Sequence, residues 1–170
     1  MKTSENPVTP SASELAAWNC LHDVPDPEIP VLSVVDLGIV RSVSATDDSV
    51  EVGVAPTYSG CPATEVIERS IVSALEKNGF ASVTLRRVLS PPWTTDWITD
   101  SGREKLLNYG IAPPIAGGGK RALLGDMRRI ACPQCASLNT ALVSEFGSTA
   151  CKAAYKCKDC LEPFEYFKCI

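Results

Sequence analysis

Two pairs of cysteines near the end of the chain restrict its fold more than any other feature. Two residues lie between the members of each pair, and 21 residues lie between the pairs, which are Cys132 with Cys135 and Cys157 with Cys160. Four thiolates on two short turns are the ligands that a tetrahedral structural zinc ion prefers. The spacing therefore predicts a C-terminal zinc ribbon. An iron ion held by the same four sulfurs is the alternative.

The predicted ribbon spans residues 126–170 and contains strand-like segments at 139–146 and 163–167. So short a segment buries little apolar surface, and we expect it to need its metal in order to fold. Two further thiols, Cys151 and Cys169, lie inside it. They are spare apolar residues, substitutes for a ribbon ligand, or a second thiol pair that holds metal transiently.

The cysteine count also bears on the cellular compartment. The chain has 170 residues and eight cysteines, and its polar N-terminus lacks the apolar run of a signal peptide. We therefore expect reduced thiols in the cytoplasm rather than disulfides. A net charge of −4 argues against non-specific binding to nucleic acid, and no apolar stretch is long enough to span a membrane.

Before the ribbon, the pattern predicts a small α+β domain over residues 12–110. A capping box, Ser11 with Glu14, begins a helix over 12–22. Two strands should cover 39–45 and the valine alternation near residue 50, and a third should cover 81–89. A short helix over 99–109 should turn Leu106 and Leu107 inward. We expect residues 1–11 to form a disordered tail and residues 111–125, which include three consecutive glycines, to form a linker.

Cys61 lies where the second strand turns into the central helix. Isoleucines at helical spacing follow it, and Pro62 suits the first helical position. Cys61 would then lie at or next to the N-cap, where backbone N–H groups and the helix dipole favour a thiolate or a bound metal. The alternative is a small buried cysteine at a helix start.

Three prolines within residues 23–30 predict a rigid extended loop that carries Asp26 and Glu28. These carboxylates either form a polar site facing Cys61, or they serve as a helix cap and a turn residue. The single histidine, His22, is expected to be a solvated or capping residue near a helix end.

Two tryptophans, Trp93 and Trp97, follow a diproline. Tryptophan is enriched where proteins dock, so an exposed docking surface for a partner is one interpretation. The other is that both rings close the bottom of a small core.

Several segments carry a family resemblance. Residues 26–30, 35–40 and 56–62 resemble the MIP18 (DUF59) family of iron–sulfur assembly proteins. Residues 91–97, 147–152 and 164–170 are similar to the branch of that family encoded with the bacterial phenylacetyl-CoA epoxidase. The resemblance implies a MIP18-type α/β domain followed by a zinc ribbon. It also implies a reactive or cluster-binding thiol at Cys61, with Asp26 and Glu28 nearby.

The resemblance further implies an accessory role in aerobic phenylacetate degradation rather than enzyme activity. The sequence agrees, since it has one histidine and lacks both the Glu-x-x-His pattern of a di-iron site and a dinucleotide fingerprint. Expected cofactors are structural Zn²⁺ and a transient iron–sulfur cluster or iron. Expected partners are the epoxidase oxygenase and reductase subunits and the iron–sulfur assembly machinery. A structural subunit that bridges oxygenase and reductase is the alternative. A thiol oxidoreductase is disfavoured because one metal site explains both cysteine pairs.

Overall fold

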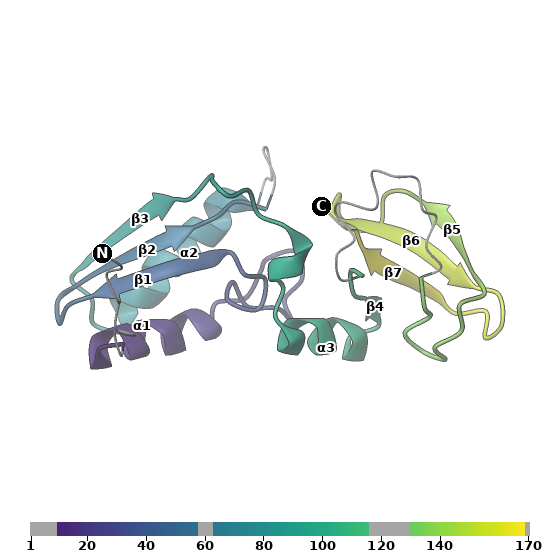
Figure 1. The fold of residues 1–170 in the computed structure, drawn as a ribbon, viewed down its shortest axis with the longest axis horizontal. Helices are drawn as coiled ribbons and strands as arrows, with labels where there is room; N and C mark the ends of the chain where they lie inside the picture. The colour runs from purple at the N-terminus through teal and green to yellow at the C-terminus, as the bar shows by residue number, and fades with distance from the viewer. Residues whose placement is uncertain (1–9, 58–62, 116–129, 169–170) are drawn as a thin grey trace, which may run out of the picture.

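The computed structural model describes residues 10–57, 63–115 and 130–168, and two separate β-sheets organise them (Figure 1). One sheet has the strand order β1-β2-β3, and the other has the order β4-β7-β6-β5. Helices α1 and α2 pack on the first sheet, and α3 lies between the two sheets (Figure 1). The predicted α+β class, with a ribbon after a small mixed domain, is confirmed.

The first sheet is built from β1 (Val40–Ala45), β2 (Ser49–Val54) and β3 (Ser82–Arg87). β1 and β2 are antiparallel, whereas β2 and β3 are parallel and are joined through helix α2 (Thr64–Lys77). Helix α2 directs Ile67, Ile71 and Leu75 into the core, as their spacing predicts.

Helix α1 (Ala12–His22) begins and ends where the sequence indicates. The Ser11 hydroxyl accepts the Glu14 N–H at 3.1 Å, and the Glu14 carboxylate accepts the Ser11 N–H at 2.8 Å. These reciprocal bonds satisfy two N–H groups that a helix start otherwise leaves without partners. His22 is exposed at the other end of the helix, and Cys20 is buried in the core.

Helix α2 begins later than Pro62 suggested. Its N-cap is Ala63 and its first helical residue is Thr64. Proline is compatible with a helix start but does not require one there. Cys61 therefore precedes the N-cap by two positions instead of occupying it, and Cys61 itself lies outside the described residues.

The turn at Asp36–Gly38 contacts Trp97 and Lys105, which lie on the segment between the first sheet and the ribbon. Asp36 accepts hydrogen bonds from the Ser33 N–H at 3.0 Å and from Lys105 Nζ at 2.7 Å. Burial alone would raise the pKa of Asp36, but the bonds from Lys105 and Ser33 outweigh it and lower that pKa. Gly38 has φ +68°, and a side chain on it would collide with the carbonyl oxygen of Trp97.

The two tryptophans do not form an exposed pair, so the docking interpretation is wrong for Trp93. Trp93 is 4% exposed, and its indole N–H donates to the Leu37 carbonyl at 2.8 Å. Trp97, in the short 3-10 helix η1 (Thr95–Trp97), is partly buried, and the Arg41 guanidinium lies 3.6 Å from its ring centroid. Trp93 is therefore a core residue, and its polar N–H can be buried because the Leu37 carbonyl accepts a hydrogen bond from it.

Helix α3 (Asp100–Asn108) differs from its prediction at one side chain. Leu106 is buried, whereas Leu107 is 46% exposed. Adjacent helical residues point about 100° apart, so a short helix lying on a surface buries only one of the two.

The ribbon sheet begins inside the segment predicted to be a linker. β4 (Ile111–Ala112) pairs in parallel with β7 (Pro163–Phe167), next to β6 (Lys152–Cys157) and β5 (Thr140–Ser144). Ile111 and Ala112 are therefore a strand and not part of a linker. Residues 116–125 of that linker, and the first nine residues of the tail, lie outside the described residues. Within the described ranges, no helix combines the length and apolar character that a membrane crossing requires.

Candidate functional site

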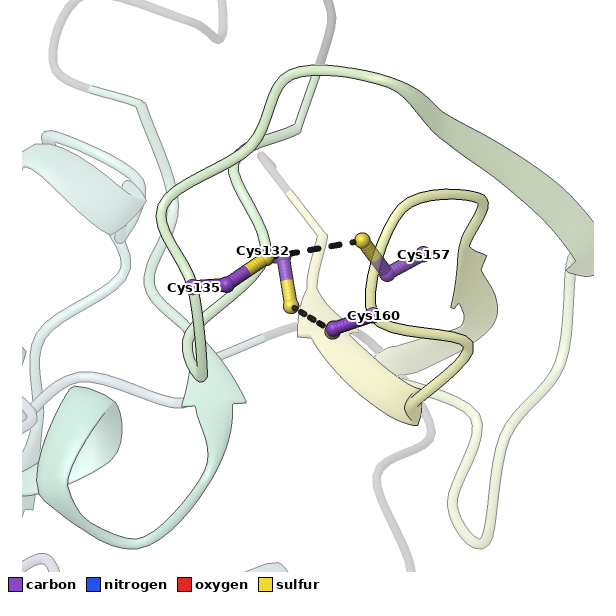
Figure 2. Close-up of side chains that lie close together, drawn as sticks. All are labelled: Cys132, Cys135, Cys157 and Cys160. Atoms are coloured by element: carbon purple, nitrogen blue, oxygen red, sulfur yellow. Dashed lines mark hydrogen bonds between the residues drawn. The ribbon is translucent and has the colours of Figure 1, made fainter.

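The four ribbon cysteines converge in space. Their sulfur atoms all lie within 4.8 Å of one another (Figure 2). Cys132 Sγ is 3.7 Å from Cys160 Sγ, and Cys135 Sγ is 3.6 Å from Cys157 Sγ. With metal–sulfur bonds of about 2.3 Å, a regular tetrahedron places its sulfurs about 3.8 Å apart. The donor set and its dimensions therefore fit a tetrahedral metal ion.

The two cysteine turns share the same backbone design. Ala136 and Leu161, which each follow the second cysteine of a pair, adopt positive φ values of 58° and 66°. The Cys132 N–H donates to the Ser137 carbonyl at 2.9 Å, and the Cys157 N–H donates to the Glu162 carbonyl at 2.9 Å. This repeated closure makes the two halves of the site alike.

Backbone donors also favour a thiolate at one of the four ribbon cysteines, Cys157. The N–H of Cys160, and secondarily that of Asp159, donates to Cys157 Sγ and lowers the pKa of that thiol to about 7. A thiol ionised near neutral pH is ready to bind a cation. The backbone of the second cysteine turn therefore favours a thiolate at Cys157.

Asp159 ties the second cysteine turn to the first. Its carboxylate accepts hydrogen bonds from the Ser137 hydroxyl and from Asn139 Nδ2, the latter at 2.7 Å. Beneath the turns lies a small cluster of buried side chains, namely Ala112, Ile130, Cys132, Cys157, Phe164 and Tyr166. Sequence reasoning missed Asp159 because an exposed carboxylate between two cysteines carries no separate signal.

In the acidic loop, the Asp26 carboxylate forms its hydrogen bonds with the backbone of the loop itself. Asp26 is 7% exposed, and its Oδ1 accepts the N–H groups of Glu28 at 2.9 Å and Ile29 at 2.7 Å. Burial raises the pKa of Asp26, and these two bonds counteract the rise. The turn-residue interpretation therefore describes Asp26.

Glu28 contacts a thiol, but that thiol belongs to the ribbon half of the chain. The Cys151 thiol lies 3.5 Å from Glu28 Oε2, and both side chains are partly exposed. Cys151 is not part of the four-sulfur group, so it does not substitute for a ribbon ligand. Cys169 and Cys61 lie outside the described residues.

Cys151 is expected to react slowly with iodoacetamide at pH 8. Burial raises the pKa of its thiol to about 11, and the charges of Glu28 and Asp26 add to the rise. Only about one thiol in a thousand is then ionised at pH 8, and the thiolate is the nucleophile. The alkylation rate, followed by mass spectrometry of the Cys151 peptide, should rise about tenfold per pH unit from pH 8 to 10. Glu28→Gln removes an opposing charge and should accelerate alkylation at pH 8, whereas a rate that levels off below pH 9 would contradict the assignment.

Two family models match the chain. A model described as iron–sulfur cluster assembly protein matches residues 14–83, and a model described as PaaD zinc beta ribbon domain matches residues 116–168. The resemblance drawn from the sequence motifs is thus confirmed for both parts of the chain.

Comparisons with individual proteins agree with the two family matches. The chain is 53% identical over 153 residues to one subunit of the "Putative 1,2-phenylacetyl-CoA epoxidase" of Escherichia coli (strain K12), covering 90% of this chain and 91% of that protein. Among solved structures, a domain of unknown function DUF59 from Bacillus anthracis is similar with a TM-score of 0.51 and 25% identity. That match covers 55% of this chain and 90% of the other.

Proposed function

This chain belongs to the PaaD family of 1,2-phenylacetyl-CoA epoxidase subunits, and from that membership we propose that it is an accessory subunit of such an epoxidase rather than its catalyst. Its task is to assemble or maintain a metal centre in the oxygenase or reductase subunit, with an iron–sulfur cluster or iron as cargo. One observation carries the proposal. Residues 14–83 match an iron–sulfur cluster assembly protein, within a chain that is related to an epoxidase subunit over 90% of its length.

The ribbon holds the resident metal in this proposal, and zinc fits its four sulfurs best. Cys132, Cys135, Cys157 and Cys160 would bind the ion, which contributes a fixed fold to a segment with a small apolar cluster. An ion bound by all four sulfurs would have no open coordination position, because four protein ligands complete a tetrahedron. The ribbon metal is therefore structural, and the cargo binds elsewhere.

We assign the cargo to Cys61, on the segment between β2 and α2. The N-cap of α2, Ala63, has no side chain that can accept a hydrogen bond from the helix start. The Ala63 side chain therefore leaves the N–H groups at that end of α2 uncapped, and together with the helix dipole these groups favour an anionic sulfur nearby. Asp26 and Glu28 are proposed as acidic neighbours of this thiol.

Cys61→Ala is expected to leave the fold intact and to yield under-metallated epoxidase. The test co-expresses the variant with the other epoxidase subunits, purifies the complex without oxygen, and measures its iron and acid-labile sulfide. A drop in both, while the variant keeps its ribbon metal and its circular dichroism, supports the proposal. Cys20→Ser, at a buried core thiol, is the matched control and should leave both contents normal.

Normal iron and sulfide in the Cys61→Ala complex would overturn the assembly role. Stable co-purification of the subunit with active complex, independent of Cys61, would then favour the bridging subunit. Metal analysis of the isolated protein complements this test, since it separates cluster carriage from the resident ribbon metal.

A further inference from the structure

The Glu28 carboxylate and the Cys151 thiol are in contact although 123 sequence positions separate the two residues. Glu28 lies on the loop after α1, and Cys151 lies just before β6. Cys151 also packs against the core of the first domain, as does Phe167 of β7. The thiol and the carboxylate are therefore brought together by the docking of the two halves of the chain.

The ribbon side of this pair is held by Glu165 on β7. Its carboxylate accepts the Ser148 N–H at 2.6 Å and forms an ion pair with the buried Lys152 at 2.7 Å. A side chain on Gly147 would lie 2.5 Å from Glu165 Oε1, so the glutamate carboxylate would have to move to accommodate one. Thr149 Oγ1 lies 3.1 Å from Cys151 Sγ. Contacts of Thr149 before the thiol and of Lys152 after it thus fix the position of Cys151.

The acidic side of the pair is also fixed in place. Asp26 anchors the backbone of Glu28, and its own N–H donates to the Leu32 carbonyl at 2.8 Å. Ile29, next to Glu28, is 2% exposed and fixes the loop in the core. Lys152 acts on the Asp26 carboxylate from the ribbon side, but it is paired with Glu165. The Glu28 carboxylate is therefore presented to the thiol on a rigid loop, in surroundings with an excess of negative charge.

We propose that Glu28 and Cys151 form a second cation site, separate from the four-cysteine site, for a divalent transition-metal ion such as Fe²⁺. A thiolate and a carboxylate together suit borderline ions of this class, whereas Mg²⁺ and Ca²⁺ prefer oxygen ligands alone. On binding, the sulfur–metal bond forms as the S–H bond breaks, and the proton leaves to solvent. Two protein ligands leave other positions to water, so the ion is held weakly and exchanges.

This inference does not rest on the proposed function, because it concerns binding by the isolated chain. Its test is a titration with Co²⁺, whose bond to a thiolate gives a near-ultraviolet charge-transfer band. The protein is the full chain with zinc already in the ribbon and with Cys61 and Cys169 changed to serine. Zinc is measured before and after, so that exchange of Co²⁺ into the ribbon is detected.

The expected result is about one Co²⁺ bound per chain, with the sulfur band present and the zinc content unchanged. Cys151→Ser should abolish the band, and Glu28→Gln should weaken binding about tenfold or more while the band persists at saturation. Cys20→Ser is the matched thiol control and should change neither. Absence of the band in the parent protein, or an identical band after Cys151→Ser, would overturn the proposal. Glu28→Gln alters a partly exposed side chain, so it remains informative if Cys151→Ser does not fold.

Discussion

Replacing Cys157 with serine is expected to abolish metal binding by the ribbon and to unfold residues 130–168. Cys157 is fully buried and supplies one of four converging sulfurs. Structural zinc sites of this kind contribute about 10–16 kcal/mol of binding free energy, which is also folding free energy. The apolar cluster beneath the site is too small to replace that contribution.

The location of the tryptophans makes this result easy to measure. Trp18, Trp93 and Trp97 all precede the ribbon, so tryptophan fluorescence reports mainly on the first domain. In Cys157→Ser the metal content should fall to zero and proteolysis should remove the ribbon, while tryptophan fluorescence stays native. Cys20→Ser controls for the loss of a buried thiol. A variant that is metal-free yet resists proteolysis would show that the ribbon folds without metal.

Trp93→Ala is expected to destabilise the first domain by about 3–5 kcal/mol, a large part of the typical stability of a domain. The change removes a side chain that is 4% exposed and leaves the Leu37 carbonyl without its indole donor. Denaturant unfolding followed by circular dichroism measures the loss.

Two further variants separate packing from hydrogen bonding. Trp93→Phe keeps most of the buried ring and loses the N–H, so its cost should be smaller, about 1–3 kcal/mol. Trp97→Ala removes a partly exposed ring and its contact with Arg41, and it should cost less than Trp93→Ala. Wild-type stability in Trp93→Ala together with loss of partner binding would restore the docking interpretation.

Local signals in the sequence predicted the elements that local interactions determine. The capping box indicated where α1 begins, because Ser11 and Glu14 satisfy each other within one turn. The cysteine spacing predicted the ribbon, because metal geometry restricts which thiols can converge. Apolar periodicity predicted the core-facing side chains of α2, because residues at helical spacing share one face.

Features that depend on distant residues escaped prediction. The orientation of Trp93 depends on the turn at Leu37, which no periodicity in the diproline segment reveals. β4 contains two residues, too few for an alternation pattern, and its partner β7 lies far along the chain. The contact between Glu28 and Cys151 arises only when the two halves dock. Each of these outcomes is decided by tertiary packing.

The parallel pairing of β4 with β7 affects the order in which the ribbon sheet can form during synthesis. Synthesis runs from the N-terminus, so β4 leaves the ribosome before any ribbon cysteine, whereas β7 leaves after all four. The only strand that pairs with β4 in the described sheets is β7, so β4 can form its inter-strand hydrogen bonds only after β7 has emerged. The four cysteines are therefore available to a metal ion before β4 has its partner strand.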